Sequence, residues 1–323
     1  MNFSAGTADK FKNFVGVNLI YKKMKLSNLH ILLTYTCSLR CKHCYVFSGP
    51  RAAGKISLSQ ISRILNESRN LTNLGLIYFG GGEPFTQYPL LLKAVNYARQ
   101  RGFKVGVETN GYFARSVDTG IRYLRPLADM GISEICISND FLHYKDPGSS
   151  PAKRALEAAQ KLNIATKWVY ISQPEMGILD IENTNSAVEV LEQRLMFTGR
   201  AAETMREDLP SSSWNSFNRC PIGDLDQSDQ YYIDAYGYVQ VCPGIAIGNA
   251  WERPLHYLIE EFDSRRHVIL QSLLDGGPSK LIQNLAIQPD REYVDACHCC
   301  YSIRRELIDQ YPDQLAPRQV YGL

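Results

Sequence analysis

The run Cys37-Ser-Leu-Arg-Cys41-Lys-His-Cys44-Tyr45 follows directly on the apolar segment Ile31–Tyr35. Its C-x3-C-x2-C spacing brings three thiols together in one loop at the end of a predicted strand. Three thiolates can hold three irons of a cubane iron–sulfur cluster and leave the fourth iron without a protein ligand. An iron with a free position can bind a substrate or cofactor, and Tyr45 would shield one face of the cluster from water. The loop therefore predicts a reactive metal centre.

A structural zinc site and disulfides are the alternatives for these cysteines. Zinc sites usually close with four ligands, so His43 would have to join the three cysteines. His43 lies between two of them on a tight turn, where we expect its ring to point away. The chain starts without a basic-then-apolar signal segment, so we expect a cytoplasmic location, in which disulfides are rare. Nine cysteines in such a chain indicate metal ligands first.

Length and composition predict a soluble protein with one large domain and a smaller module. The chain has 323 residues, of which 45% are hydrophobic and 21% charged, and its net charge is +2. Such a small net charge predicts no global attraction to nucleic acid or membranes. No apolar run reaches the roughly 20 residues that span a bilayer. A basic group near the start would form a solvated face or a docking surface for an acidic electron-transfer protein: Lys10, Lys12, Lys22, Lys23 and Lys25.

Apolar strand-like runs alternate with segments of helical periodicity from residue 29 onward. We expect strands at 29–34, 76–79, 104–108, 132–138, 164–171 and 195–197, and helices at 57–71, 88–101, 117–130, 152–162 and 187–191. Residues 173–185 lack a clean period and predict a loop. Six β-α repeats predict an α/β fold in which right-handed crossovers curl a parallel sheet into a partial (β/α)6 TIM-type barrel. The repeats end near residue 205, before the roughly 250 residues that a complete eight-stranded barrel needs.

A glycine-rich turn, Gly80-Gly81-Gly82-Glu83-Pro84, follows the second predicted strand. Glycines allow a ligand to approach the backbone without a side-chain clash. Glu83 and exposed backbone carbonyls could accept hydrogen bonds from the ammonium group of a bound amino acid. A plain turn is the alternative. In parallel barrels the reacting groups gather at the carboxyl ends of the strands, so we expect this turn to lie beside the cysteine loop.

The cysteine loop and the glycine turn together resemble the radical S-adenosylmethionine (SAM) enzymes. The resemblance implies a [4Fe–4S] cluster on the three loop cysteines, whose open iron chelates the amino and carboxyl groups of SAM. It also implies that one electron cleaves the sulfonium bond and that a 5′-deoxyadenosyl radical then removes a hydrogen atom from the substrate. Gly81, Gly82 and Glu83 match the stretch that binds the methionine amino group.

The same resemblance implies contacts to SAM from other strand ends. A planar guanidinium suits a carboxylate, and polar strand-end side chains suit ribose hydroxyls. Each of these residues could instead be an ordinary strand-end or core residue. The positions concerned are Asn110, Ser138, Asn139 and Asp140 at the ribose, Met196, Phe197, Thr198 and Gly199 at the adenine ring, and Arg200 at the methionine carboxylate.

Five further cysteines lie beyond the predicted barrel: Cys220, Cys242, Cys297, Cys299 and Cys300. Two strand-like runs flank 234–237, which predicts a hairpin with Gly237 at the turn and a cysteine ending the returning strand. One cysteine, a Gly-x4-Cys hairpin and a C-x2-C pair resemble the twitch module, the shortened form of the SPASM extension in radical SAM enzymes. The resemblance implies one auxiliary [4Fe–4S] cluster on Cys220, Cys242, Cys297 and Cys300.

Cys299 leaves that ligand set open, because it could replace either neighbour in the C-x2-C pair. A structural zinc in the same cysteines is the alternative. Cys136, inside the fourth predicted strand, is expected to be a buried apolar residue. We predict four regions: an N-terminal extension at 1–28, the partial barrel at 29–205, a small α+β twitch/SPASM-like module at 206–302, and a C-terminal helix and tail at 303–323.

The resemblance implies an oxidative radical SAM enzyme. A second cluster could accept the electron that a substrate radical loses, which favours two-electron oxidation over isomerisation. A peptide or protein side chain is the expected substrate, as in RiPP-type maturases, and a small-molecule alcohol is the alternative. A flavodoxin or ferredoxin-type protein is the expected electron donor. A radical-generating activase would carry cysteines within 45–80, where there are none, and a non-catalytic iron–sulfur or zinc protein would not need the glycine turn.

The sequence does not decide which residue serves as the catalytic base for the second proton. Asp140 and His143 are the first candidates, with Glu108 and Asp234 beside them, because carboxylates and imidazoles can take up protons. Each of the four could equally be a structural residue.

Overall fold

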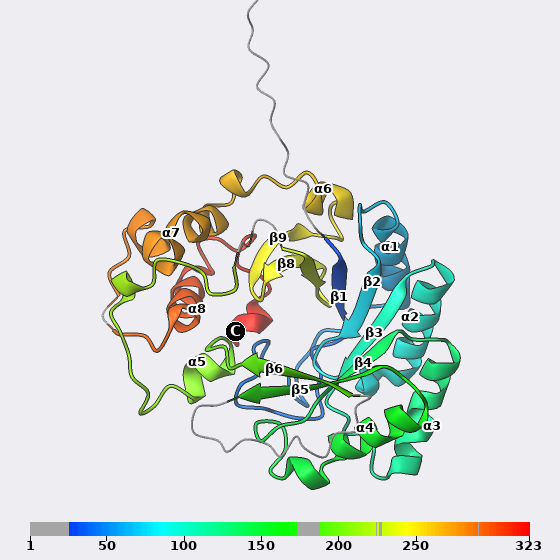
Figure 1. The fold of residues 1–323 in the computed structure, drawn as a ribbon. Coiled ribbons are helices and arrows are strands. Elements are labelled where there is room, and N and C mark those ends of the chain that lie inside the picture. Colours follow the sequence, from blue (N-terminus) through cyan, green and yellow to red (C-terminus); the bar gives the residue numbers. More distant parts are fainter. Residues whose placement is uncertain (1–25, 173–187, 224, 226–227, 290) are drawn as a thin grey trace, which may run out of the picture.

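The computed structural model describes residues 26–172, 188–223, 225, 228–289 and 291–323, and its strands form one nine-stranded sheet (Figure 1). The strand order is β6-β5-β4-β3-β2-β1-β7-β8-β9. The strands are β1 Asn28–Leu32, β2 Leu76–Gly80, β3 Lys104–Thr109, β4 Glu134–Ser138, β5 Thr166–Ser172, β6 Val188–Arg194, β7 Gln230–Ile233, β8 Tyr238–Cys242 and β9 Ile245–Asn249. All neighbours from β6 to β7 pair in parallel.

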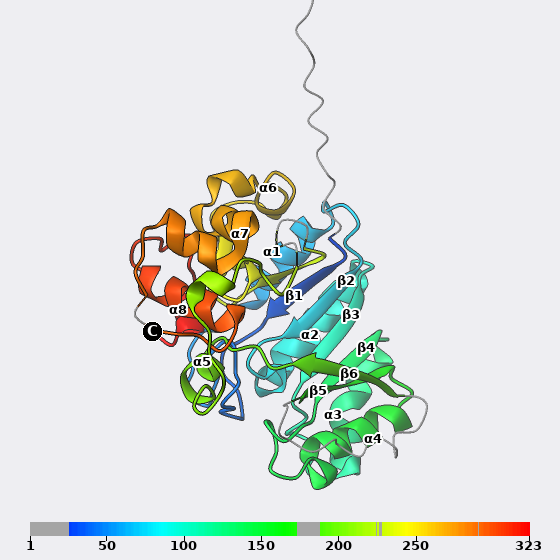
Figure 2. The same cartoon turned by 60° about the vertical axis from the view of Figure 1, so that its left-hand side comes forward.

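Helices cover the outer side of this sheet, which bends around a central space (Figures 1 and 2). Ser57, Ser116 and Ser150 each cap a helix by accepting a hydrogen bond from the backbone N–H three residues on. The first four helices connect the first five strands: α1 Leu58–Ser68, α2 Tyr88–Gln100, α3 Val117–Asp129 and α4 Pro151–Lys161. Those that follow the later strands are α5 Arg200–Thr204, α6 Leu255–Ile259, α7 Val268–Asn284 and α8 Ala296–Leu307.

The α/β class and the parallel sheet are confirmed, but the prediction for the end of the repeat is wrong. Strand β6 occupies Val188–Arg194, where the sequence predicted a helix at 187–191, and residues 195–197 lie outside any strand. The two β-branched residues Val188 and Val190 alternate with Glu189, a pattern that suits a strand better than a helix. The strand is held by pairing with β5 along its whole length. The loop predicted at 173–185 lies outside the described residues.

Strand β7 joins the hairpin to the parallel sheet, because it pairs in parallel with β1 and places Tyr232 opposite His30. The hairpin itself is confirmed: β8 runs antiparallel to β7, and β9 antiparallel to β8. The sequence did not predict the pairing of β1 with β7, since strands so far apart in the chain leave no local signal of their partnership. Strands from the predicted barrel at 29–205 and from the predicted module at 206–302 thus belong to one sheet.

Alternation along the strands separates an apolar outer face from a polar inner one. The register places Tyr232, His30, Tyr78 and Gly106 side by side on β7, β1, β2 and β3. These positions face the inside of the bend. The intervening residues are fully buried apolar side chains beneath the helices: Leu29, Ile31, Ile77, Phe79, Val105, Val107, Ile135 and Ile137.

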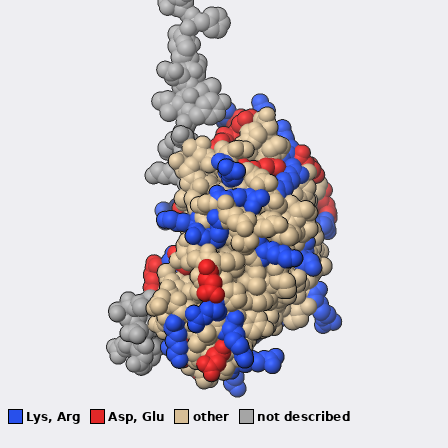
Figure 3. Space-filling model, turned by 90° about the vertical axis from the view of Figure 1, so that its right-hand side faces the viewer, with Lys and Arg blue, Asp and Glu red and all other residues tan. Residues whose placement is uncertain are grey.

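The surface over α1 to α4 carries Lys and Arg side chains with Asp and Glu among them (Figure 3). This mixture agrees with the small net charge of the chain. Of the helices in the described ranges, none combines the length and the apolar character needed to cross a membrane. The five lysines near the start of the chain lie outside these ranges.

Candidate functional site

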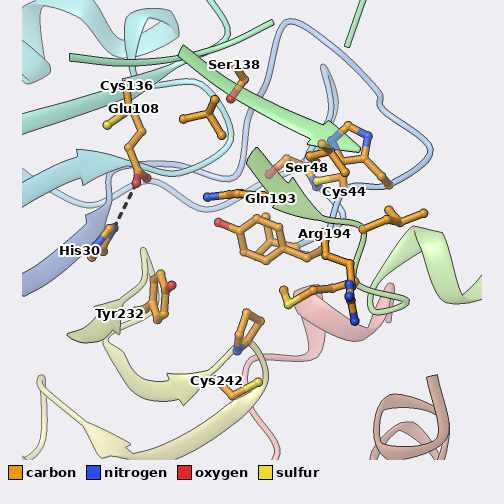
Figure 4. Close-up of a pocket in the computed structure, with 18 of the residues that line it drawn as sticks. His30, Cys44, Ser48, Glu108, Cys136, Ser138, Gln193, Arg194, Tyr232 and Cys242 are labelled. Carbon is orange, nitrogen blue, oxygen red and sulfur yellow. Dashed lines mark hydrogen bonds and ion pairs between the residues drawn. The ribbon is translucent and has the colours of Figure 1, made fainter. Parts of the chain in front are cut away.

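A cavity of about 1160 Å³ lies inside the bend of the sheet, and both cysteine sets contribute to its wall. Figure 4 shows Cys44 and Cys242 on opposite sides of it. Several residues predicted from the sequence line it: Cys37, Cys41, Cys44, Tyr45, Gly81, Gly82, Asn110, Ser138, His143, Arg200, Cys242 and Cys297. Others lie in the protein behind the wall and are almost completely buried: Glu83, Asn139, Asp140 and Thr198.

The sulfur atoms of the cysteine loop accept hydrogen bonds from nearby N–H groups. The backbone N–H of Leu39 points to Sγ of Cys37 at 3.4 Å, and that of Ser48 to Sγ of Cys44 at 3.3 Å. Nδ2 of Asn110 lies 3.5 Å from Sγ of Cys37. Burial raises the pKa of Cys37 and of Cys41 to about 12, so a thiolate there needs a cationic partner such as iron.

The glycine turn packs against the backbone that leads into the cysteine loop. The N–H of Gly82 donates to the carbonyl of Thr34 at 2.6 Å, and the N–H of Glu83 to that of Thr36 at 3.0 Å. A Cβ atom at position 82 would lie 2.6 Å from the carbonyl oxygen of Tyr35. The glycines are therefore required by the close approach of two segments of the protein itself, in addition to any role towards a ligand.

Glu83 anchors this turn to the end of β3. Its carboxylate accepts hydrogen bonds from the N–H of Asn110 at 2.8 Å, the hydroxyl of Thr109 at 2.8 Å and the N–H of Phe85 at 3.1 Å. Burial raises the pKa of Glu83 to about 7, against the opposing effect of these donors. In this structure its side chain holds the wall in place and does not face the cavity.

Arg200 clamps the cysteine loop from the other side. Its Nε donates to the carbonyl of Cys41 at 2.8 Å, and a terminal nitrogen donates to that of Ser48 at 2.7 Å. Gly199 has φ +58°, and a Cβ there would lie 2.5 Å from the carbonyl oxygen of Cys44. The hydroxyl of Thr198 is buried without a hydrogen-bond partner among the described residues. The guanidinium predicted for the methionine carboxylate thus already has two partners on the loop.

The residues after β4 divide between the interior and the cavity. Asn139 donates to the carbonyl of Pro147 at 3.1 Å and accepts from Ser150 at 2.8 Å, which fixes the start of α4. Asp140 lies 2.9 Å from Nδ1 of His143 and accepts from the N–H of Ile171 at 3.1 Å. Burial alone would raise the pKa of Asp140, but the hydrogen bond and charge of His143 lower it.

His43 does not point away from the cysteines, so that prediction is wrong. Its ring lines the cavity and contacts the ring of His143 edge-on, with the two ring centroids 4.5 Å apart. Ligand atoms of Cys41, His43 and His143 lie within 4.8 Å of one another, close enough to hold a single cation. Burial, together with the charge of His143, lowers the pKa of His43 to about 3, so its imidazole is neutral. A mononuclear metal is therefore a chemical alternative at this end of the cavity.

The structure brings together four cysteines of the second set and leaves one apart. Cys242 interacts electrostatically with Cys220 and Cys300, and Cys297 interacts with these three thiols. Cys299 is completely buried in the apolar core, and among the cysteines it interacts with Cys300 alone. Cys297 and Cys300 lie near the start of α8, whose positive end favours negatively charged sulfur. The ligand set of Cys220, Cys242, Cys297 and Cys300 stays a prediction, and the burial of Cys299 in the apolar core gives a reason to leave it out of that set.

Arg304, one turn after Cys300 on α8, is a buried cation beside these sulfurs. One guanidinium nitrogen donates to the carbonyl of Pro243 at 2.9 Å and to the hydroxyl of Tyr321 at 3.0 Å. Its charge also interacts with Cys300 and Cys242. Its buried Nε has no hydrogen-bond partner in the described part of the chain. A buried donor without a partner, close to Cys300 and Cys242, fits a sulfur-rich, negatively charged group.

Several cavity residues were missed from the sequence. His30 and Tyr232 face the cavity, and Gln193 and Arg194 lie at the end of β6 (Figure 4). Tyr78 and Lys167 also line the cavity. A polar residue inside the apolar run 29–33 was the available signal for His30. Cys136 is 8% exposed, which confirms its predicted burial, but its side chain reaches the cavity wall.

Comparison with known proteins shows which family the sequence around this site is similar to. The model of the radical SAM superfamily matches residues 31–183, which contain the end of β1, the cysteine loop, the glycine turn and strands β2 to β5. This part of the chain is therefore similar to the radical SAM superfamily. The members of this superfamily are enzymes, and the likeness implies a [4Fe–4S] cluster that binds SAM. The cavity-facing thiols, with their N–H donors and without a fourth cysteine in the loop, fit such a cluster.

Similar proteins share only part of their length with this chain. A tungsten-containing aldehyde ferredoxin oxidoreductase cofactor-modifying protein of Pyrococcus furiosus is 31% identical over 115 residues, which are 35% of this chain and 31% of that protein. The antilisterial bacteriocin subtilosin biosynthesis protein AlbA of Bacillus subtilis is 34% identical over 85 residues, 26% of this chain and 18% of AlbA. The chain thus spans less than half the length of these relatives.

Among solved structures, BtrN in complex with AdoMet and 2-DOIA is similar at a TM-score of 0.48 and 14% identity. The match covers 83% of this chain and 97% of BtrN. At this TM-score the likeness supports no further conclusion.

Proposed function

We propose that the protein is an oxidative radical SAM enzyme with two [4Fe–4S] clusters on one cavity. Cys37, Cys41 and Cys44 would hold the cluster that binds SAM, and the bent parallel sheet would act as a partial (β/α)6 barrel around it. When bound, that cluster supplies the electron that cleaves SAM and so generates the radical that removes a hydrogen atom from the substrate. The observation that carries the proposal is that the three loop cysteines line the same cavity as Cys242 and Cys297 of the second set.

The residues of the chain would hold this chemistry in place and keep water out. Arg200 and the glycine turn fix the cysteine loop, while Asn110 and the backbone N–H groups point at its sulfurs. The second set, Cys220, Cys242, Cys297 and Cys300, would form a twitch-like site for an auxiliary cluster, with Arg304 beside it. Because four cysteines leave no open iron, this cluster would accept an electron rather than bind substrate. The reaction would therefore be a net two-electron oxidation.

We propose a peptide or protein side chain as the substrate. A relative is named for the biosynthesis of a bacteriocin, and bacteriocins are peptides. The alternative, a small-molecule alcohol, is favoured by the polar side chains on the cavity wall, such as Glu108 and Tyr232. A flavodoxin or ferredoxin would supply the electron.

Metal content and SAM cleavage test this proposal first. Anaerobically reconstituted protein should contain about eight irons and no stoichiometric zinc. With dithionite and SAM it should release 5′-deoxyadenosine. Zinc in place of half the iron would contradict the auxiliary cluster. Zinc at the loop, bound with His43 and His143, would contradict the whole proposal.

Co-expression with the short open reading frames that flank its gene tests the substrate class. Mass spectrometry should show a peptide that has lost two hydrogens only when the enzyme is present. Unmodified peptides, together with oxidation of an added alcohol, would replace the peptide by the small-molecule substrate.

A further inference from the structure

A histidine–glutamate pair crosses the inner face of the sheet below the cysteine loop. Nδ1 of His30 on β1 lies 3.3 Å from Oε1 of Glu108 on β3 (Figure 4). Both residues line the cavity. Strand β2 lies between them, so the pair exists only because Glu108 reaches across a neighbouring strand.

Two glycines make room for this arrangement. A Cβ atom at Gly80 on β2 would lie 2.7 Å from Oε2 of Glu108, so any other residue there would push the carboxylate away from His30. A Cβ at Gly106 on β3 would collide with the ring of Tyr78, which stacks on His30 with ring centroids 4.6 Å apart. Glycine at these two strand positions therefore leaves room for the carboxylate of Glu108 and for the ring that stacks on His30.

The pair is reachable from the cavity, although it is surrounded by protein. The side chain of Glu108 is 41% exposed and that of His30 is 10% exposed. Nδ1 of His30 is buried and makes no aligned hydrogen bond with the described residues. Because Nδ1 faces the carboxylate, a neutral imidazole keeps its proton on that atom and leaves Nε2 as an acceptor.

The charges around the pair keep Glu108 ionised. Burial alone would raise the pKa of Glu108, but a positive charge on His30 brings the pKa below its usual range. Tyr78 from β2 and Tyr232 from β7 flank the imidazole, and Cys136 from β4 lies near the carboxylate. The other nearby cation, Lys167, is paired with Glu134 at 3.0 Å and does not neutralise Glu108.

The His30–Glu108 pair lies close to the cysteine loop, where SAM would react. Glu108 lies near the end of β3, Asn110 follows directly after that strand, and both line the cavity. Asn110 contacts Cys37 of the cysteine loop. A substrate that fills the space beneath the loop would therefore have its reacting carbon near the loop and its neighbouring polar atom near the pair.

We propose that His30, held by Glu108, is the proton acceptor for the oxidation of the substrate. This rests on the proposed function and specifies a substrate whose reacting carbon bears an O–H, N–H or S–H bond. The carbon loses a hydrogen atom to the 5′-deoxyadenosyl radical, which becomes 5′-deoxyadenosine. The X–H bond breaks, its proton passes to Nε2 of His30, and the remaining electron leaves to an iron–sulfur cluster. A carbon–heteroatom double bond forms.

The test separates hydrogen-atom removal from proton removal in the holoenzyme. It uses the substrate found by the co-expression or alcohol assay, deuterated at the reacting carbon, with the variants His30→Ala and Glu108→Gln. Both variants should still transfer deuterium into 5′-deoxyadenosine, whereas oxidised product should fall by about 10²-fold. Added imidazole should restore product in His30→Ala. Glu261→Gln, which changes an exposed carboxylate outside the cavity lining, should leave the ratio of product to nucleoside unchanged.

Unchanged product in His30→Ala, or an equal fall in product and deuterium transfer without imidazole rescue, would overturn the assignment. Absence of nucleoside in the wild-type enzyme would instead refute the proposed function. A second readout does not need a substrate. Carbon-13 NMR of the oxidised holoenzyme should show a higher pKa for Glu108 in His30→Gln than in the wild type, and an unchanged pKa would show that the two side chains do not interact.

Discussion

The two cysteine sets share one cavity, but the chain builds them differently. The first set lies between residues 37 and 44 on one loop, and its geometry follows from local spacing. The second set gathers thiols from three places that are distant in the chain: Cys220, Cys242 at the end of β8, and Cys297 and Cys300 on α8. A three-thiol loop leaves a metal position for a ligand, whereas a four-thiol site is closed. Their difference in construction therefore parallels their proposed difference in role.

A buried arginine serves each set in its own way. Arg200 binds backbone carbonyls of the first loop and so fixes its shape. Arg304 lies beside the sulfurs of the second set and acts on their charge. The C-terminal segment connects the two sites: Gln319 donates to the carbonyl of Phe47 at 3.1 Å, and the hydroxyl of Tyr321 donates to that of Gly244 at 2.7 Å. Substitution of Arg200 should therefore affect the shape of the first loop, and substitution of Arg304 the charge at the second cysteine set.

The largest expected difference is between cysteines of the two sets. Cys41→Ala should abolish 5′-deoxyadenosine formation and lower the iron content by about four atoms per chain. Cys242→Ala should lose a similar amount of iron but retain SAM cleavage, and it should form no oxidised product because the electron acceptor is missing. Iron analysis and chromatography of the nucleoside measure both effects.

Cys299→Ser is the matched control, since this cysteine lies outside both sets. It should keep the full iron content and both activities. Loss of iron equal to that in Cys242→Ala would show that the second ligand set is assigned wrongly.

A smaller effect is expected from the clamp on the first loop. In Arg200→Lys a single ammonium cannot reach the carbonyls of Cys41 and Ser48 together, so the free energy of unfolding should fall by about 1–3 kcal/mol. Denaturant unfolding measures this loss. The exposed substitution Arg253→Lys should change the stability by less than about 0.5 kcal/mol. Equal stability of Arg200→Lys and wild type would mean that the clamp does not hold the loop.

Arg304, the cation beside the second cysteine set, should affect the reduction potential of the auxiliary cluster as well as the stability of the protein. Arg304→Gln removes a positive charge next to Cys300, so the reduced auxiliary cluster should become less favourable and its reduction potential more negative. The potential of the SAM-binding cluster should stay the same. A redox titration followed by electron paramagnetic resonance distinguishes the two clusters. Equal shifts in both, or no shift, would remove Arg304 from this role.

The smallest expected effect is a pH dependence of stability that arises from Asp234 in the hairpin of β7 and β8. Asp234 is buried in the hairpin turn, where it accepts hydrogen bonds from Tyr35 and Gln240, and burial raises its pKa from 3.8 to about 7. The folded state therefore binds more protons than the unfolded state between these values. Its stabilising contribution is complete below the lower value and is lost as the pH rises through the higher one.

Thermal unfolding measures this contribution. The midpoint of the wild type should fall more between about pH 5 and pH 8 than that of Asp234→Asn, which cannot titrate there. Parallel curves for the two proteins would show that Asp234 is ionised in the folded state throughout.

Local patterns in the sequence predicted the residues that lie close together in the chain. The cysteine loop, the hairpin at Gly237 and most β-α repeats depend on spacing within a few residues. Roles that depend on distant partners were not predictable. Arg200 was expected at a carboxylate but binds the loop, and Glu83 was expected at an ammonium group but anchors the wall, because their partners come from other segments. His30 lies in an apolar run, and only the pairing of β1 with its neighbours shows that it faces a cavity.

The central claim is that the cluster on Cys37, Cys41 and Cys44 has one iron that binds SAM through its amino and carboxyl groups. Electron–nuclear double resonance of the reduced holoenzyme tests it directly, using SAM labelled with nitrogen-15 in the amino group or oxygen-17 in the carboxylate. We expect a hyperfine coupling of each label to the cluster in the wild type and none in Cys41→Ala. A wild-type spectrum without coupling to either label would contradict the account.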